Sequence, residues 1–313
     1  MISCTEFIPV YSELFKYLEE EKGGYDEVVR YWEYISDTYV ADLLGKEVAG
    51  KGIRGCWDYW SKSLTEEACD FRMELDEKEG TFFIDMRKCP SRGMLNSLEH
   101  MEPYHDYCGH CLVLYARQLK KYGIFEDKVD MSHVDEAKCF ESYRIKPEFV
   151  PENCKGEKLE MDVKASDNEY FHRDFHISGE RGLRYVGENF GDESVVEYLT
   201  RFTKAYYSPL IARIRENGLS ELKNHIENIY KLEKAPENVE CRLTDNELYV
   251  TVSECPGVKY MKSSGYEPSK WYIEDTRTVN LVIAEESGYG FEMISYNPEN
   301  GAAEYRFYVK SYI

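Results

Sequence analysis

Apolar residues in the second half of the chain recur at the three- and four-residue spacing of an amphipathic helix. The first such run ends at Gly191 and carries Phe171, Phe175, Leu183, Val186 and Phe190. Ser166 and Glu169 precede it at the spacing of a capping box, in which each side chain bonds the other residue's backbone N–H. Two further runs, 192–217 with Pro209 as an expected break and 219–232, complete three predicted helical segments.

Downstream of these helices the pattern changes to two hairpins separated by one helix. The predicted elements are strands 239–243 and 247–253, a helix over 271–286, and strands 290–296 and 303–309. Asp245-Asn246 is a typical hairpin turn between the first two strands. This order (ααα-ββ-α-ββ) predicts an α+β domain in which a helical layer packs on a small antiparallel sheet.

The first half of the chain gives the same order and repeats several segments at an offset of about 166 residues. The matched segments are YDEVVRYW with DESVVEYL, FFIDMRKCPSRGML with LYVTVSECPGVKYM, and SYRIK with RFYVK. A nearly constant offset of this length indicates tandem duplication of one domain rather than a solenoid. We therefore predict a first α+β repeat over 1–147, a linker rich in Pro and charge over 148–167, and a second repeat over 168–313. The two halves can pair as a pseudo-dimer, which buries within one chain the surface that single-domain proteins bury between chains. We therefore predict a monomer.

Composition and charge narrow the classes of partner. The 313 residues include 59 acidic and 39 basic side chains, a net charge of −20, while 42% are hydrophobic. The apolar content supports a packed core, and the acidity excludes nucleic acid and an anionic membrane surface as partners. The start of the chain lacks a basic segment before an apolar one, so no signal peptide is expected. Because no secretion is expected, the protein is predicted to be cytoplasmic and its ten cysteines to be reduced thiols.

The element order, the strands that end in Cys-Pro, and a late cysteine before the last strand suggest a family. These cysteines are Cys89, Cys255 and Cys139. The chain resembles a tandem repeat of the L-2-amino-thiazoline-4-carboxylic acid hydrolase-like family and of the 4-vinyl reductase domain, which has the TRAPP-like, haem-NO-binding-like fold. The resemblance implies small-molecule binding, with either hydrolysis of a thiazoline- or amide-type C–N bond or a non-catalytic role in ligand sensing or assembly. Ala303 stands where the late cysteine is expected in the second half, so a thiol-dependent activity is not expected there.

The densest cluster of chemically active residues is YHDYCGHC, which contains His105, Cys108, His110 and Cys111. Two cysteines separated by two residues can bind one metal ion or form one disulfide. A zinc site of Cys108 and Cys111 with His105, Cys89 or Cys139 is one interpretation, and a thiol redox pair is another. His105 and His110 are also candidates for a substrate pocket. Small buried residues of a core helix are the simplest alternative, since a single CxxC is a weak signal.

A second cluster is FHRDFH, with His172, Asp174 and His176. Two histidines four residues apart lie on one face of a helix and can bind a divalent metal such as zinc. Asp174 would then point away from both, so it is a candidate for the substrate pocket only. Alternatively, these three residues are ordinary polar side chains that flank the apolar face of the helix and have no functional role. The first half lacks an equivalent of this pair.

Cys89 and Cys255 end equivalent strands and are candidate nucleophiles if a base such as His172, His176 or His225 lies nearby. A buried structural cysteine is the commoner outcome. Neither GxSxG nor the glycine-rich nucleotide loops occur. The leading hypothesis is a small-molecule-binding protein with metal-assisted hydrolysis at His172 and His176. A ligand sensor and a thiol redox protein using Cys108 and Cys111 are the alternatives.

Overall fold

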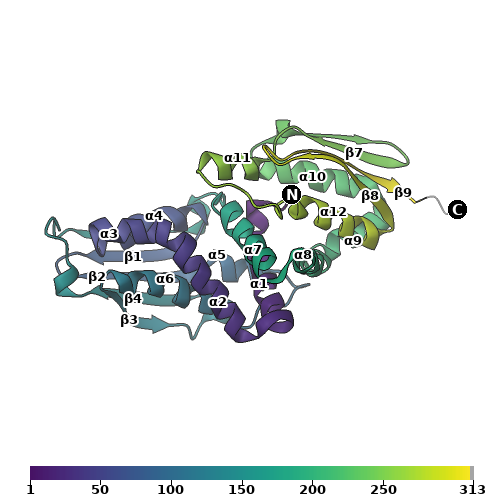
Figure 1. Ribbon diagram of the computed structural model, residues 1–313. Coiled ribbons are helices and arrows are strands. Elements are labelled where there is room, and N and C mark those ends of the chain that lie inside the picture. Colours follow the sequence, from purple (N-terminus) through teal and green to yellow (C-terminus); the bar gives the residue numbers. More distant parts are fainter. Residues whose placement is uncertain (311–313) are drawn as a thin grey trace. The chain divides into compact units, whose positions relative to one another are not determined.

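The computed structural model describes residues 1–310 and divides the chain into two compact units (Figure 1). Unit 1 contains Met1–Leu14 together with the chain from Arg173 onward, and unit 2 contains Phe15–His172. Unit 1 is therefore built from two separate stretches of sequence. The division differs from the predicted one, which assigned the first residues to the first repeat.

Unit 2 contains five α-helices and a five-stranded antiparallel sheet among the described residues. Its helices are α2 (Tyr25–Ile35), α3 (Lys46–Lys51), α4 (Arg54–Glu66), α5 (Pro90–Ser97) and α6 (Gly109–Lys121). Its strands are β1 (Asp70–Asp76), β2 (Thr81–Lys88), β3 (Ile124–Asp130), β4 (Cys139–Ile145) and β5 (Lys158–Val163). Helix α1 (Phe7–Leu18) passes from unit 1 into unit 2 after Leu14.

Unit 1 contains six further helices and a four-stranded antiparallel sheet in its described part. Its helices are α7 (Phe175–Phe190), α8 (Asp192–Tyr206), α9 (Ser208–Asn217), α10 (Leu219–Leu232), α11 (Pro256–Ser263) and α12 (Glu274–Ser287). Its strands are β6 (Val239–Leu243), β7 (Glu247–Val252), β8 (Tyr289–Asn297) and β9 (Ala302–Val309). Helices α10 and α12 pack against this sheet (Figure 1).

The two sheets share one topology. The order β6-β7-β9-β8 in unit 1 corresponds to β1-β2-β4-β3 in unit 2, where β5 adds a fifth strand beside β1. Helices precede the first hairpin and separate it from the second in both halves. The α+β class with two similar sheet-bearing halves is therefore confirmed.

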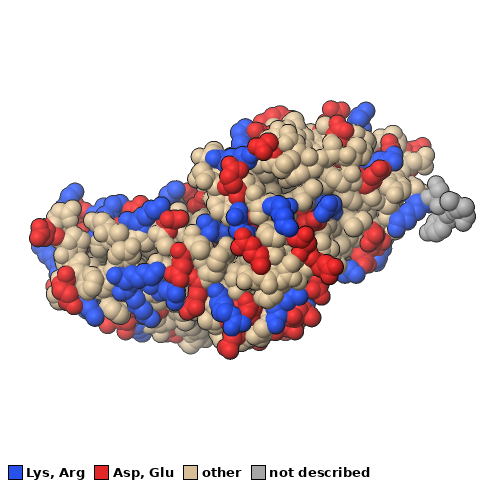
Figure 2. Space-filling model, viewed as in Figure 1, with Lys and Arg blue, Asp and Glu red and all other residues tan. Residues whose placement is uncertain are grey.

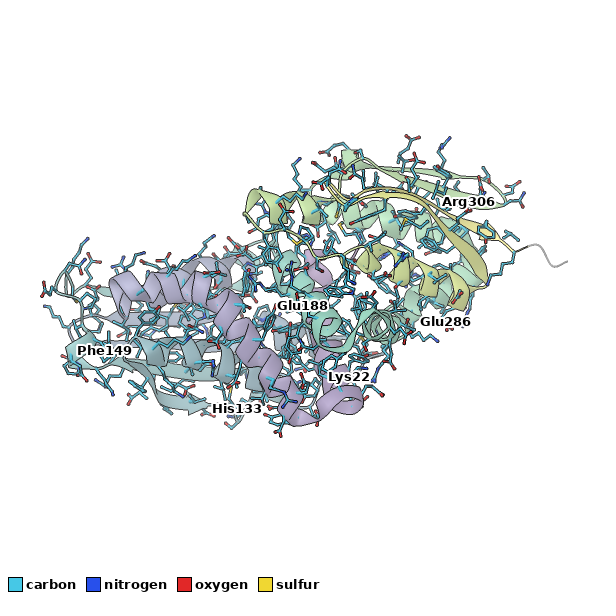
Figure 3. All side chains as sticks on the ribbon, viewed as in Figure 1. Lys22, His133, Phe149, Glu188, Glu286 and Arg306 are labelled. Carbon is cyan, nitrogen blue, oxygen red and sulfur yellow. The ribbon has the colours of Figure 1, made fainter. Side chains whose placement is uncertain are left out.

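Alternating side chains give each sheet one buried and one solvent-facing side. On β1 the inward residues Phe71, Met73 and Leu75 are fully buried, as the period-2 pattern of a half-buried strand requires. On the outer side of the second sheet, Arg306 lies between Glu292 and Glu247 (Figure 3). Acidic and basic side chains are likewise interspersed over the molecular face in Figure 2. No helix within residues 1–310 is long and apolar enough to cross a membrane.

Several predicted elements agree with the structure and two differ. The helix over 219–232 and both hairpins of the second half are present, and Pro209 lies in the first turn of α9, where the chain breaks from α8. The predicted linker over 148–167 contains β5, which pairs with β1 along its whole length. Ser166 lies in a short 3-10 turn rather than at a helix start, because α7 begins only at Phe175.

Candidate functional site

The candidate site begins at a short turn near the start of the chain, in unit 1. Residues Cys4–Glu6 form one turn of 3-10 helix that leads into α1. Ser3 caps it: the Ser3 hydroxyl accepts a hydrogen bond from the Thr5 N–H (3.1 Å), and Glu6 accepts one from the Ser3 N–H (2.9 Å). This reciprocal capping fixes the backbone around Cys4.

Glu233 follows α10 and is almost completely buried. The next residue, Lys234, has φ of 57°, so the chain turns sharply after the helix. Glu233 Oε1 accepts hydrogen bonds from the Cys4 N–H and from the Ser3 hydroxyl, both 2.7 Å long. The capped turn and the end of α10 are thus joined through one carboxylate.

His176 lies in the first turn of α7, and its Nε2 is 3.0 Å from Glu233 Oε2. Gly257, in the first turn of α11, allows the imidazole to approach, since a Cβ at that position would lie 2.9 Å from His176 Nδ1. The same Cβ would lie 2.4 Å from the hydroxyl of Tyr272. The side chains of His176 and Tyr272 therefore converge on a position that only glycine leaves open.

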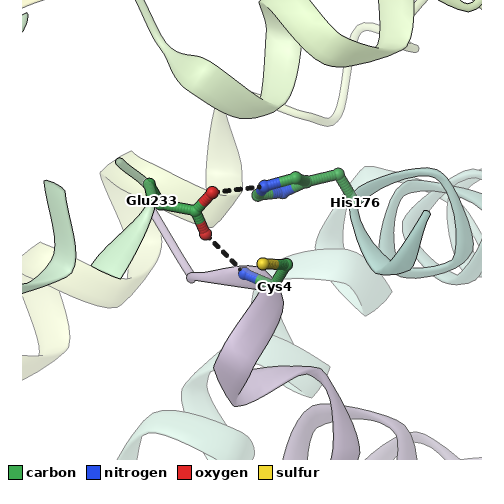
Figure 4. A group of neighbouring side chains, drawn as sticks. All are labelled: Cys4, His176 and Glu233. Atoms are coloured by element: carbon green, nitrogen blue, oxygen red, sulfur yellow. Dashed lines mark hydrogen bonds and ion pairs between the residues drawn. The ribbon is translucent and has the colours of Figure 1, made fainter. Parts of the chain in front are cut away.

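Cys4, His176 and Glu233 form a three-ligand group (Figure 4). One ligand atom of each residue lies within 4.8 Å of the other two, and all three residues are buried. Within residues 1–310 this is the one group of three or more His, Cys, Asp or Glu side chains with that spacing. Thiolate, imidazole and carboxylate together are typical of zinc and related transition metals.

The charges in the site differ strongly from those of free side chains. Burial raises the pKa of Glu233, but the charge of His176 and the hydrogen bonds from Ser3 and Cys4 outweigh it and hold the pKa at about 2. Burial and the neighbouring Glu233 carboxylate raise the pKa of the Cys4 thiol. Without a cation, the site therefore holds an ionised carboxylate beside a protonated thiol.

A small cavity adjoins the group. It has a volume of about 30 Å³, room for roughly two water molecules, and His176, Tyr272, Asp275 and Glu180 contribute polar groups to its wall. Phe7 and Phe175, stacked with ring centroids 4.4 Å apart, belong to its apolar part. The Tyr272 hydroxyl is buried and has no hydrogen-bond partner in the described part of the chain.

The predicted pair of His172 and His176 does not form a helical metal site. His172 precedes α7, belongs to unit 2, and places its Nδ1 2.7 Å from Glu66 Oε2. The predicted helix was to carry both histidines, but α7 begins at Phe175, three residues after His172. Asp174, predicted for the pocket, accepts a hydrogen bond from the Tyr260 hydroxyl and does not belong to the cavity wall.

The candidate nucleophiles both lie at helix starts, Cys255 buried and Cys89 half-buried. Cys255 precedes α11 and lies 3.1 Å from the Met1 sulfur, and burial raises its pKa to about 11. Cys89 precedes α5, where its Sγ accepts a long hydrogen bond (3.5 Å) from the Arg92 N–H, and burial raises its pKa to about 12. Both thiols are therefore protonated at neutral pH, which does not favour nucleophilic attack.

The residues of the YHDYCGHC cluster lie in unit 2, where they have different environments. His105 is exposed and bonds Glu19. His110 is half-buried and bonds the Tyr107 carbonyl, and desolvation of its ring lowers the His110 pKa to about 4. Cys108 and Cys111 lie at the start of α6, and all ten cysteines of the chain are free thiols. Burial raises the pKa of both thiols, the opposite of what a reactive redox pair needs.

Cys4 and Glu233 are the site residues that sequence reasoning missed. Neither belongs to a motif, and 229 positions separate them. The repeat offers one signal for Glu233, since Glu67 occupies the matching position after α4 and burial raises its pKa. Comparisons of the chain with known protein families, curated proteins and solved structures give no match.

Proposed function

We propose that unit 1 binds one divalent transition metal ion, such as zinc, through Cys4 Sγ, a ring nitrogen of His176 and a carboxylate oxygen of Glu233. The observation that carries this proposal is the buried group whose three ligand atoms lie within 4.8 Å of one another. Three protein ligands leave a fourth position of a tetrahedral site for water or substrate, which is typical of catalytic rather than structural zinc.

The surroundings of the group support a hydrolytic role. His176 contributes to both the ligand group and the cavity wall, so a molecule in the cavity would lie beside the open metal position. A bound divalent ion polarises a substrate and lowers the pKa of water toward neutrality. Hydrolysis of a C–N bond adds the hydroxyl of that water to the carbon, and the departing nitrogen receives the proton. A small amide- or thiazoline-type substrate is the proposed class, and its entry requires the walls of the cavity to move apart, since the cavity volume of about 30 Å³ holds roughly two water molecules.

The chain itself supplies the positioning. Ser3 and the Cys4 N–H hold one oxygen of Glu233, so its other oxygen keeps a fixed place beside His176. Such supporting hydrogen bonds orient metal ligands and raise affinity. The hydrogen bonds from the Ser3 hydroxyl and the Cys4 N–H also favour the ionised form of Glu233, which is the form that binds a cation.

A non-catalytic ligand-binding role is the second candidate function. The observation that favours it is the small volume of the cavity, about 30 Å³, which admits only a very small molecule unless the walls move. Tight binding of a small ligand with no turnover, measured by calorimetry and product analysis on the same sample, would support this alternative over hydrolysis.

The metal proposal is tested by elemental analysis of the full-length protein after equilibration with zinc and desalting. We expect one equivalent of zinc, lost or bound at least ~10-fold more weakly in Cys4→Ala, His176→Gln and Glu233→Gln. Cys241→Ala on β6 and His225→Gln on α10 are matched controls in unit 1 and should retain the metal. Wild-type protein that takes up no metal, or variants that keep it, would contradict the proposal.

A further inference from the structure

The two sheets differ at one edge. In unit 2 the strand β5 pairs with β1 along its whole length, with Val163 opposite Phe71 at one end. The strand of unit 1 that corresponds to β1 is β6, and it lies at the edge of its sheet with β7 as its one neighbour among the described strands. The same position in the duplicated fold is thus paired in unit 2 and open in unit 1.

The hydrogen bonds on one side of β6 show which backbone groups face its open side. Just before β6, the Asn238 carbonyl accepts a hydrogen bond from the Ser253 N–H (2.9 Å), and just after it the Thr244 N–H donates to the Glu247 carbonyl (2.8 Å). Bonded positions alternate along an antiparallel strand, so every second residue from Asn238 to Thr244 bonds β7. The residues between them direct their N–H and C=O groups to the open edge, and these are Val239, Cys241 and Leu243.

The side chains of β6 also alternate between two faces. Val239, Cys241 and Leu243 lie opposite the buried residues of β7 and share their inner face. Leu243 is nevertheless 40% exposed at this edge. Glu240 and Arg242 lie on the solvent-facing side and are exposed. The Arg242 guanidinium is 4.9 Å from the centre of the Tyr249 ring on β7, which holds it on that side.

Strand β6 lacks the irregularities that protect other sheet edges of this chain. The edge strands β3 and β8 each have an irregular register, between Glu126 and Lys128 and between Met293 and Ser295. Bulges of this kind discourage the addition of a further strand. Strand β6 pairs with β7 without any irregularity and contains no proline. Its open edge is therefore suited to accept another strand.

The sequence of β6 is complementary to itself in the antiparallel direction. It reads Val-Glu-Cys-Arg-Leu, so a two-fold axis at Cys241 places Glu240 of each copy opposite Arg242 of the other. The same axis places Val239 opposite Leu243 on the inner face. Opposite charges and apolar pairs at facing positions stabilise an antiparallel pair of strands. We propose that two copies of this chain pair through β6, antiparallel about Cys241, which joins two four-stranded sheets into one of eight strands.

The β1–β5 pair shows the same arrangement within one chain. On its inner face, Met161 of β5 lies opposite Met73 of β1. On its outer side, Arg72 and Glu160 form an ion pair with a nitrogen–oxygen distance of 2.9 Å. A second copy of β6 would reproduce both features, with apolar side chains inside and paired charges outside. This fold therefore already contains the kind of strand pairing that the proposal requires.

The proposed interface is small, because β6 has five residues. Interfaces of small area are typical of dimers whose formation depends on concentration. This dimer differs from the monomer that the duplication predicts, and the two differ twofold in mass. The proposal is independent of the metal site, since none of Cys4, His176 and Glu233 belongs to β6.

The test measures the mass of the full-length protein by sedimentation over roughly a hundredfold range of concentration. We expect the mass to rise from that of one chain toward that of two. A single-chain mass at every concentration would overturn the proposal and favour a strand of another protein as the occupant of this edge.

Hydrogen exchange at both ends of the same range locates the interface. The amides of Val239, Cys241 and Leu243 should become protected at high concentration. The amides of Glu240 and Arg242, which bond β7, are the internal control and should be protected throughout. A dimer in which the three edge amides still exchange quickly would show that another surface pairs, and would refute the proposal.

Charge variants test the register. Glu240→Arg and Arg242→Glu each set like charges opposite one another, so each should weaken dimerisation about 10-fold or more. The double variant restores both pairs of opposite charges and should dimerise as the wild type does. Single variants that dimerise as tightly as the wild type would show that this register is wrong.

A proline variant tests the backbone pairing. Cys241→Pro removes an N–H that points to the open edge and none that bonds β7, so the variant should be monomeric with an unchanged circular dichroism spectrum. A folded proline variant that still forms the dimer would contradict the proposal. If this variant does not fold, the charge variants still decide the outcome.

Discussion

Gly257 has a role that its lack of a side chain explains. A methyl group there would lie closer to the Tyr272 hydroxyl and to the His176 ring than packed atoms approach each other. Because both neighbours are buried and Glu233 holds His176, neither side chain can move freely. The glycine therefore permits the imidazole to occupy its place in the candidate site.

Gly257→Ala should destabilise unit 1 by about 1–3 kcal/mol, the usual cost of overpacking, and weaken metal binding at His176. Denaturant unfolding and metal titration measure the two effects. Gly179→Ala in α7 is the matched control, since its Cβ would lie at an ordinary 3.8 Å from Phe7. It should leave stability unchanged or raise it by about 0.5–1 kcal/mol. Equal behaviour of the two variants would contradict the packing argument.

Glu6 makes the stability of unit 1 depend on pH. Burial raises its pKa from 4.5 to about 7. A carboxyl with a raised pKa stabilises the folded state fully below pH 4.5, and this contribution is lost as pH rises to about 7. The expected loss is about 3 kcal/mol in the free energy of unfolding.

The pH effect is measured by denaturant unfolding at a series of pH values from 4 to about 8. Glu6→Gln should remove this component and flatten the profile, whereas Glu237→Gln, at an exposed position, should not. A profile of the Glu6 variant that still falls like that of the wild type would show that another group is responsible.

At the scale of elements, the regular patterns predicted the fold well where one face of an element is buried. Helix α10 and strands β7 and β9 follow their apolar periodicity because each buries a single face. Strand β5 alternates polar and apolar residues as a strand does, but it lies in a segment rich in Pro and charge that was interpreted as a linker. The start of α7 was misplaced because a local capping pattern at Ser166 was not followed by helix.

The candidate site was only partly predictable for a related reason. His176 stands in a conspicuous sequence cluster, but its partners Cys4 and Glu233 come from a turn before α1 and from the end of α10. Local patterns carry no information about such long-range approaches. In unit 2, Cys108 and Cys111 of the CxxC pattern lie at the start of α6, and their role as metal ligands stays a prediction.

Strand β5 gives a prediction at this scale. Its amide protons that face β1 should exchange with solvent slowly, since β5 pairs with β1 from Lys158 to Val163. Hydrogen exchange resolved to single residues measures this. The loop residues 152–156 serve as the internal control and should exchange quickly. Uniformly fast exchange over 158–163 would restore the interpretation of this segment as a linker.

At the scale of the whole molecule, duplication produced two units with one topology and different buried clusters. Unit 1 holds a buried group of thiol, imidazole and carboxylate with the spacing of metal ligands, and no such group occurs among the described residues of unit 2. Only Cys89 and Cys255 match between the halves at the ends of equivalent strands. Two copies that keep their fold while their buried polar residues diverge are free to acquire separate chemistry.

The division of unit 1 between the two ends of the sequence sets an order of events on the ribosome. Unit 2 is continuous, so it can fold while the rest of the chain is still being made. Cys4 emerges first but must wait for His176 and Glu233, more than 170 and 220 residues later. At about 5–20 residues per second, that delay lasts roughly 10–45 s. On our proposal, the ion in unit 1 can therefore enter only after Glu233 has been made.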